Sequence, residues 1–227
     1  YNTRSLNEHL NSSKWWDFGR KQGGLFIFTP TITAANSYWY KGTADALYQN
    51  IKFLKESHEP YVVIASGDGI YKLDYNKVLE EHISNGADIT VVCKDMAPGE
   101  DDINRFGVVK MNDDGRIIDF EEKPLVAGTN TVSIGVYVIR RRQLIELLET
   151  CANEGRNDFV RDILVRYKGV KRIYGYKMDT YWRNIGTKES YYRANMDFLK
   201  KDVRDFFFKQ HPDIYSRVDD LPPAKYN

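Results

Sequence analysis

The sequence predicts an α/β domain with a mixed, mostly parallel sheet. Short apolar runs alternate along the chain with runs of helical periodicity, as in strands joined by crossover helices. Two apolar runs, residues 61–65 (YVVIA) and 89–93 (ITVVC), are continuous, which indicates strands buried on both faces. Turn-forming residues 112–115 separate two further short runs and predict an antiparallel hairpin inserted in the sheet.

The first half of the chain contains two predicted helices. Residues 44–55 form one because apolar residues recur at spacings of three and four, with Thr43 as the candidate N-cap. Residues 76–85 form the other, which ends at Asn85-Gly86. The predicted elements of this half, in order, are a strand over 25–29, a helix over 44–55, a strand over 61–65, a helix over 76–85 and a strand over 89–93.

The second half begins with the hairpin, whose strands read GVVKM and RIIDF. Ligands of open α/β sheets bind beyond the carboxyl ends of the strands, so we expect the segment after residues 61–65 to lie at the active edge. The remaining predicted elements are a strand over 132–139, helices over 143–151 and 158–167, a strand over 171–177 and a helix over 188–200.

The end of the chain predicts a linker. Residues 219–223 combine two acids with tandem prolines. The three phenylalanines at 206–208 are expected to pack, since a solvated aromatic cluster is a liability. We therefore divide the chain into a domain at 1–204 and a linker at 205–227. The sequence opens without an initiator methionine, so we expect the domain to be truncated at its N-terminus.

Composition excludes several classes of function. Lysine and arginine total 33 against 32 acidic residues, a net charge of +1, so neither nucleic acid nor an anionic membrane is an expected partner. No apolar run approaches the ~20 residues needed to span a bilayer, and no signal peptide is visible. Cys93 and Cys151 lack metal-ligand spacing and fit a reducing compartment, so we expect a cytoplasmic protein.

Asp68 lies in a Gly-Asp-Gly turn directly after the strand predicted over 61–65. Flanking glycines let a ligand approach the backbone closely, and a carboxylate there can hold a hard cation. An aspartate that only forms the turn is the competing interpretation.

Glu122 and Lys123 follow the second hairpin strand and precede Pro124, which biases Lys123 towards extended geometry. The lysine could neutralise a phosphate and the glutamate could accept sugar hydroxyls. A surface ion pair is the competing interpretation.

Three weaker candidates remain. Residues 39–46 lead into a helix whose N-terminus can attract phosphate, beside aromatic residues that can cover a base. An ordinary capped helix packed by its aromatics explains them equally. Ser133 could present a hydroxyl to a sugar, and Asp158 before Phe159 is most simply an N-cap.

As a set, these segments resemble glucose-1-phosphate adenylyltransferase, also called ADP-glucose pyrophosphorylase, of bacterial glycogen synthesis. The ending IYSRVDDLPPAKYN is similar to the family's link into a C-terminal left-handed β-helix. The resemblance implies a Rossmann-like nucleotidyltransferase domain, with that β-helix in the full-length protein. The matching segments are WYKGTADALYQN (39–50), SGDGIYKLDY (66–75), RFGVVKMNDDGRIIDFEEKP (105–124), SIGVY (133–137), DFVRDI (158–163) and YWRNIGTKESYYRAN (181–195).

The resemblance also implies a reaction, in which ATP and glucose 1-phosphate give ADP-glucose and pyrophosphate with the help of Mg²⁺. Asp68 would be the metal-binding catalytic aspartate, and Lys123 would hold the phosphate of glucose 1-phosphate. The family is tetrameric, so a homo- or hetero-tetramer with a catalytic homologue is expected. The remaining implied roles are the sugar site for Glu122, Ser133, Asp158, Phe159 and Trp182, the nucleotide site for Tyr40, Gly42 and Thr43, and transmission of activation for Trp39.

Two departures from the family pattern lower the expected activity. The GGxGTRL loop that cradles the triphosphate should lie upstream of Tyr1, so residues 1–227 alone are not expected to catalyse the reaction. Catalytic members read YWRDVGT, with the aspartate as second metal ligand, where this chain has Asn184; they usually carry histidine where it has Gly69. Losing a carboxylate ligand should cost at least ~10-fold in affinity or activity, since losses one layer further out cost that much.

Three functional interpretations follow. The first is a non-catalytic, regulatory-type subunit that pairs with a catalytic homologue, because the sugar framework is retained while Asn184 replaces the metal ligand. The second is an active adenylyltransferase that uses Asn184 as a neutral ligand. The third is a related transferase that makes UDP- or GDP-sugars.

Overall fold

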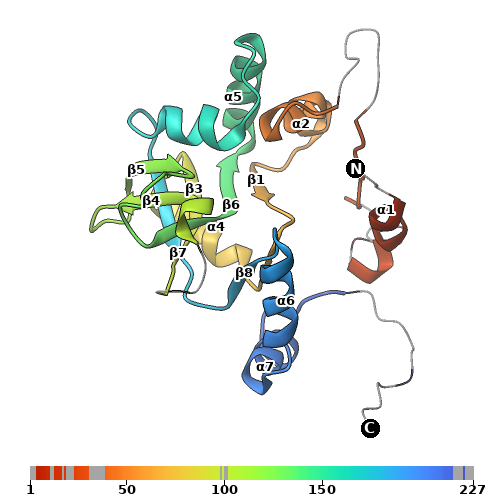
Figure 1. Ribbon diagram of the computed structural model, residues 1–227. Coiled ribbons are helices and arrows are strands. Elements are labelled where there is room, and N and C mark those ends of the chain that lie inside the picture. The colour runs from red at the N-terminus through yellow and green to blue at the C-terminus, as the bar shows by residue number, and fades with distance from the viewer. Residues whose placement is uncertain are drawn as a thin grey trace.

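The computed structural model describes residues 4–10, 13–16, 18, 23–30, 39–97, 99, 102–216 and 222 (Figure 1). Its centre is a six-stranded sheet of order β5-β4-β6-β3-β7, in which β1 also pairs with β6. Strands β2 and β8 form a separate two-stranded sheet. The strands are β1 (Tyr61–Ala65), β2 (Gly69–Tyr71), β3 (Ile89–Asp95), β4 (Gly107–Met111), β5 (Ile117–Glu122), β6 (Thr131–Arg140), β7 (Ile173–Lys177) and β8 (Trp182–Asn184).

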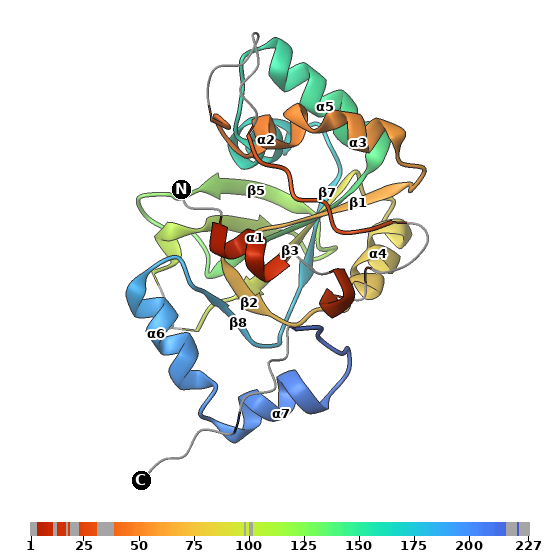
Figure 2. The ribbon, with the colours of Figure 1, turned by 90° about the vertical axis from the view of Figure 1, so that its right-hand side faces the viewer.

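Helices α2, α3 and α5 lie on one side of this sheet and α4 on the other, while α6 and α7 lie beyond the β2–β8 pair (Figure 2). Within the described ranges, no helix is long and apolar enough to cross a membrane. The helices are α1 (Arg4–Leu10), α2 (Thr43–Gln49), α3 (Ile51–Glu56), α4 (Tyr75–Ser84), α5 (Arg141–Asn153), α6 (Lys188–Asp197) and α7 (Lys201–Lys209), with 3₁₀ turns η1 (Ser13–Trp16) and η2 (Ile103–Arg105) and the π-helix η3 (Val160–Val165).

The α/β class is confirmed, but the expectation of mostly parallel pairing is wrong for the described strands. Among these, only β3 and β7 pair in parallel, while β1, β3 and β4 each pair antiparallel with β6. Strands β1, β3, β4 and β7 therefore share one direction, and β6 runs against its neighbours. Strand–helix alternation predicted the shared direction, but no local pattern indicates that β6 inserts between β1 and β3.

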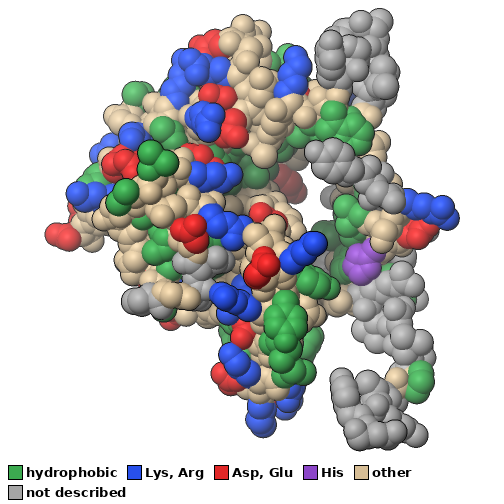
Figure 3. All heavy atoms as spheres, viewed as in Figure 1, with side chains coloured by type: hydrophobic (Ala, Val, Ile, Leu, Met, Phe, Trp, Pro, Cys, Tyr) green, Lys and Arg blue, Asp and Glu red, His purple; other side chains and the backbone are tan. Residues whose placement is uncertain are grey.

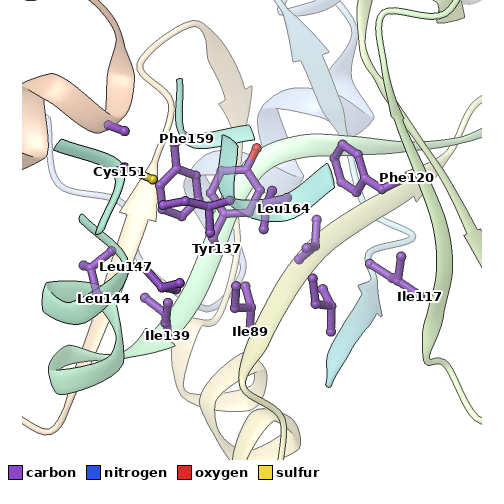
Figure 4. Close-up of a cluster of buried hydrophobic side chains, with 14 of the residues drawn as sticks. Ile89, Ile117, Phe120, Tyr137, Ile139, Leu144, Leu147, Cys151, Phe159 and Leu164 are labelled. Atoms are coloured by element: carbon purple, nitrogen blue, oxygen red, sulfur yellow. The ribbon is translucent and has the colours of Figure 1, made fainter. Parts of the chain in front are cut away.

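The core has two layers because successive side chains of a strand point to opposite faces. On β6, Tyr137 and Ile139 pack with the cluster that includes Leu144 of α5 and Phe159 (Figure 4). Val136 and its same-face neighbours pack instead on the α4 side, with Val78 and Trp182 as members of the same cluster. One layer of the core is thus built mainly of aliphatic and aromatic side chains, and the second reaches the candidate site through Trp182.

Several sequence predictions are confirmed with small shifts. The helix predicted over 76–85 is α4, where Asp74 accepts the N–H of Asn76 at 3.0 Å and Gly86 has a φ of 57°. The hairpin is β4–β5, closed by Gly115 at a φ of 77°. The strands predicted over 89–93, 132–139 and 171–177 correspond to β3, β6 and β7, and the last three predicted helices to α5, η3 with its flanking helical residues, and α6.

Three predictions in the first half need correction, two of them on segments that do form regular structure. The helix predicted over 44–55 is divided at Asn50 into α2 and α3. Strand β1 is present, but it is not buried on both faces, since Val63 is 44% exposed. Its continuous apolar run failed as a burial signal because, among the described strands, β1 has a partner only in β6.

The strand predicted over 25–29 is also wrong. These residues have no regular secondary structure, and no described strand pairs with them. The segment is instead held against α3 by aromatic packing. The ring centroid of Phe26 lies 5.5 Å from that of Phe53 on α3, and the ring centroid of Phe28 lies 4.4 Å from it. Apolar β-formers make a strand only where a neighbour completes the ladder.

The C-terminal part differs from the predicted linker at 205–227, because α7 continues to Lys209 and the boundary after 204 falls within it. Phe207 is buried as expected, but Phe208 is 64% exposed. Lys72 is buried and donates from Nζ to the carbonyls of Phe206 and Phe207, which ties α7 to the segment after Asp68. Apolar side chains gather over α6 and α7 (Figure 3). Residues 217–221 and 223–227 lie outside the described residues.

Candidate functional site

The small β2–β8 sheet brings Asp68 and Asn184 together. Gly69 of β2 is paired with Asn184 of β8, and the backbone N–H of Ile185 donates to the carbonyl of Asp68 at 2.8 Å. Asp68 directly precedes Gly69, so its backbone lies beside that of Asn184 although the two are far apart in sequence. The fold therefore places the backbones of these two residues side by side.

Asp68 is exposed and its carboxylate is held from one side. The Ser66 hydroxyl donates to Asp68 Oδ1 at 2.5 Å, and the Ser66 N–H donates to the carbonyl of Gly135 at 2.8 Å. Gly135 has a φ of 78°, and a Cβ there would lie 2.8 Å from Ser66 Cβ. Only glycine fits at position 135, and this close contact holds the Asp68 turn against β6.

Asn184 is buried, and its side-chain oxygen has a structural partner. Oδ1 accepts the backbone N–H of Gly186 at 2.9 Å, which closes the turn after β8. The one amide atom able to coordinate a cation is thus engaged within the turn. A carboxylate of the same shape could accept that N–H with one oxygen and keep the second oxygen for a metal.

Trp182 lies two residues before Asn184 on β8, pairs with Tyr71 of β2 and is 4% exposed. Its ring packs edge-on against Phe106 at 5.3 Å, and its indole Nε1 is buried without an acceptor in the described part of the chain. A Cβ on Gly69 would lie 3.1 Å from that nitrogen. Gly69 therefore leaves space beside the Trp182 indole N–H that a side chain would crowd.

Glu122 and Lys123 occupy the end of β5. Lys123 Nζ lies 3.5 Å from Glu122 Oε1, and only the lysine side chain is well exposed. The extended geometry predicted for Lys123 is wrong, because its φ is 50°. Its N–H donates to the carbonyl of Phe106 at 3.1 Å and draws the chain back towards β4. A non-glycine residue at positive φ costs about 1 kcal/mol or more and is concentrated at functional sites.

Ser133 is buried on β6 and contacts a residue that the sequence analysis missed. Its hydroxyl donates to the Tyr137 hydroxyl at 3.4 Å and accepts the Gly135 N–H at 3.3 Å. Tyr137 packs against Phe159 at 5.2 Å between ring centroids, and its hydroxyl points away from the aliphatic side chains (Figure 4). Burial raises the pKa of Tyr137, so the phenol stays neutral. Tyr137 lies four residues after Ser133, and an even spacing along a strand places two side chains on the same face. This spacing is the signal that could have identified Tyr137 from the sequence.

Asp158 and Phe159 meet the segment before α2. Asp158 Oδ1 accepts the N–H of Arg161 at 2.7 Å, which confirms the predicted cap. Thr43 is not the N-cap of α2, a position held by Gly42; the Thr43 hydroxyl instead accepts the N–H of Phe159 at 2.9 Å. This bond between distant segments cannot be read from local capping preference.

The N-terminus of α2 is already bonded to protein. The N–H groups of Ala44 and Asp45 both donate to the carbonyl of Asn157, at 2.8 and 3.3 Å. Gly42 allows this docking, since a Cβ there would lie 2.4 Å from the same carbonyl oxygen. The first turn therefore offers fewer free donors to a phosphate than its sequence indicates.

Tyr40 and Trp39 are predicted site residues that the structure does not connect to the rest of the candidate site. The Tyr40 hydroxyl accepts from Asn50 at 3.1 Å and donates to the carbonyl of Phe28 at 3.5 Å, while Trp39 is 60% exposed. Within the described residues, no hydrogen bond or ring contact joins either to the Asp68 or Glu122 neighbourhood. Their proposed roles rest on the resemblance alone.

Glu122→Gln is expected to raise the free energy of unfolding at neutral pH. Burial raises the pKa of the Glu122 carboxyl above its ordinary value of 4.5, so the folded state binds its proton more readily than the unfolded chain. Stability therefore falls as pH rises from that value through the raised pKa, and glutamine avoids the loss. Urea unfolding between about pH 4 and 8 tests this. Glu121→Gln, at the exposed neighbouring position, is the control; equal effects of the two variants would contradict the burial argument.

The residues present fit Mg²⁺ only in part. Mg²⁺ is bound by one or two carboxylates together with substrate phosphates, and Asp68 supplies one. Asn184 supplies no second carboxylate, because its side chain is a neutral amide, and its one oxygen already accepts the Gly186 N–H. In the part of the chain that the structure describes, no group of three or more His, Cys, Asp or Glu side chains gathers.

Comparison with known proteins assigns the class of this fold and site. The family model of the nucleotidyl transferases matches residues 1–201, and the chain belongs to that family. Within it, the chain is similar to proteins named glucose-1-phosphate adenylyltransferase. Identities are 37% over 228 residues with the protein of Pseudothermotoga lettingae, 36% over 226 residues with that of Thermosipho melanesiensis and 35% over 226 residues with that of Bacillus subtilis.

These alignments include nearly all of this chain, with 99%, 99% and 98% covered in the same order. They include 53%, 54% and 59% of the relatives. The chain thus spans little more than half the length of the curated relatives it matches.

Proposed function

We propose that the chain is the nucleotidyltransferase domain of a glucose-1-phosphate adenylyltransferase subunit in glycogen biosynthesis, and that this subunit is catalytically impaired and regulatory. The observation that carries the proposal is the environment of Asn184. It lies beside Asp68, where the family's catalytic members have aspartate, and its oxygen is held by Gly186. A neutral, engaged amide is a poor substitute for a metal-binding carboxylate.

The sugar side of the proposed site is connected through the fold. Lys123 is tied to Phe106, whose ring contacts Trp182, and β2 joins Trp182 to the Asp68 turn. In this proposal Lys123 neutralises the phosphate of glucose 1-phosphate, and Glu122 accepts sugar hydroxyls. Ser133, Asp158 and Phe159 complete the sugar site, and Trp182 donates from its indole N–H.

The reaction itself requires positioning and charge neutralisation rather than covalent chemistry by the protein. The sugar phosphate attacks the α-phosphorus of ATP in line with the departing pyrophosphate, so oriented cations and donors supply the rate enhancement. Mg²⁺, when bound by Asp68 and the substrate phosphates, neutralises charge on those phosphates. Because Asn184 is neutral, this neutralisation is weaker. The residues of the proposed sugar site are retained, while catalysis is impaired.

We further propose that the subunit works in a tetramer beside a catalytic homologue, to which it contributes regulation. Trp39 is the residue proposed to transmit activation. The alternative of an active enzyme that uses Asn184 as a neutral ligand is disfavoured because the Asn184 oxygen already accepts the Gly186 N–H and carries no full negative charge.

Comparative binding of nucleotide sugars tests the proposed substrate class. The full-length protein is expected to bind ADP-glucose more tightly than UDP-glucose or GDP-mannose when measured by calorimetry. Lys123→Gln is the paired variant and should weaken the binding of glucose 1-phosphate, with Lys110→Gln, an exposed lysine of β4, as the control. Tighter binding of a uridine or guanosine sugar would favour a related transferase instead.

A further inference from the structure

A basic groove lies outside the site described above. It has a volume of about 300 Å³ and is formed where the loop after α3 and the first residue of β1 meet the start of α5. Figure 2 shows these elements together at one end of the molecule, on the side of α3 and α5. Its lining residues belong to none of the segments that carry the family resemblance. They are His58, Pro60, Tyr61, Arg140, Arg141 and Arg142.

Two of the arginines are held in position by the fold. Arg141 donates from Nε to the carbonyl of Glu59 at 2.7 Å and from Nη1 to that of Leu54 at 3.0 Å. The Arg140 guanidinium lies over the Tyr61 ring, 5.7 Å from its centroid. These contacts fix the direction of both side chains and leave further N–H donors on each guanidinium, since each carries five.

The groove is lined by positive charge. No carboxylate lines it, and none of the three arginines forms an ion pair with any side chain in the described ranges. By contrast, other arginines are paired, such as Arg166 with Glu154 and Arg183 with Asp197. Three adjacent cations repel one another, and a bound anion would relieve that repulsion.

We propose that this groove binds a small phosphate-bearing anion with two or more negative charges. Guanidinium groups match the geometry of phosphate oxygens and form short, charge-assisted hydrogen bonds with them. The volume is at the lower end of small-molecule sites and suits a phosphate ester rather than a polymer. The chain's near-neutral charge of +1 likewise disfavours a nucleic acid partner.

Titration of the full chain with inorganic phosphate tests the proposal, with calorimetry for affinity and NMR for location. Arg140→Gln/Arg142→Gln is expected to weaken binding by about tenfold or more, because two charged donors are lost while the structural Arg141 stays. Arg116→Gln/Arg193→Gln removes the same charge from exposed positions elsewhere and should bind as the parent does. Lys123→Gln should also bind here normally, which separates this groove from the proposed sugar-phosphate site.

The NMR measurement keeps the test decisive if the double variant fails to fold. In the parent chain, phosphate is expected to shift the amide signals of residues 58–61 and 140–143. Unchanged affinity in a folded Arg140→Gln/Arg142→Gln variant would overturn the proposal. Shifts confined to other regions, or no binding by the parent, would do so as well.

Discussion

Replacing Asn184 with aspartate in the full-length protein is expected to raise the rate of ADP-glucose formation by at least about tenfold. The aspartate has nearly the shape of the asparagine, so one oxygen can keep the Gly186 hydrogen bond at 2.9 Å. The other oxygen takes the place of the amide nitrogen, and the carboxylate adds a full negative charge on the strand paired beside Asp68. Initial rates at several Mg²⁺ concentrations measure the effect, which should include a lower Mg²⁺ requirement.

Two control variants separate a metal effect from a charge effect. Asn85→Asp adds the same charge at an exposed position after α4 and should leave the rate unchanged. Asp68→Asn in the Asn184→Asp background should remove the gain, because both carboxylates are needed. No gain from Asn184→Asp, or an equal gain from Asn85→Asp, would show that the residue at 184 does not limit metal binding.

Gly42→Ala is expected to lower the free energy of unfolding by about 1–3 kcal/mol, the usual cost of overpacking. The added methyl group would lie 2.4 Å from the carbonyl oxygen of Asn157 and 2.9 Å from its carbon. That carbonyl is fixed because Ala44 and Asp45 both donate to it, so backbone rather than a flexible side chain must move. The φ of Gly42 is 178°, which any residue adopts. The expected loss of stability therefore comes from steric crowding alone and not from backbone strain.

Urea unfolding of the variant against the parent measures this loss. Gly169→Ala is the matched control, since a Cβ there meets nothing within 4 Å. The Gly42 variant should also loosen the bond from the Phe159 N–H to Thr43 and weaken glucose 1-phosphate binding. Equal stability of the two variants would contradict the close docking of the α2 N-terminus.

The sequence predicted most elements of the fold, because helices such as α4 and the β4–β5 hairpin carry their own periodicity, caps and turn residues. Errors arose where distant partners decide the outcome. Strand β6 inserts antiparallel between β1 and β3, and residues 25–29 pack through aromatic rings rather than in a ladder. Neither arrangement can be predicted from the local sequence pattern.

The candidate site shows the same division. The family resemblance implied that Asp68 and Asn184 lie together, and the short β2–β8 pair brings their backbones side by side. Thr43 and Lys123 were misjudged, because a hydrogen bond from another segment overrides the cap preference of one and the pre-proline preference of the other. Tyr137 was missed because a buried tyrosine on a strand looks like core until its hydroxyl is seen to contact Ser133.

The most direct test of the proposed role is an assay of ADP-glucose formation by the full-length protein, alone and mixed with a catalytic homologue. Alone, the protein is expected to reach at most about a tenth of the homologue's rate, the loss estimated for one missing carboxylate ligand. Mixed, it should change the homologue's response to activators while leaving the chemistry to that partner. Full activity of the protein alone would contradict the account.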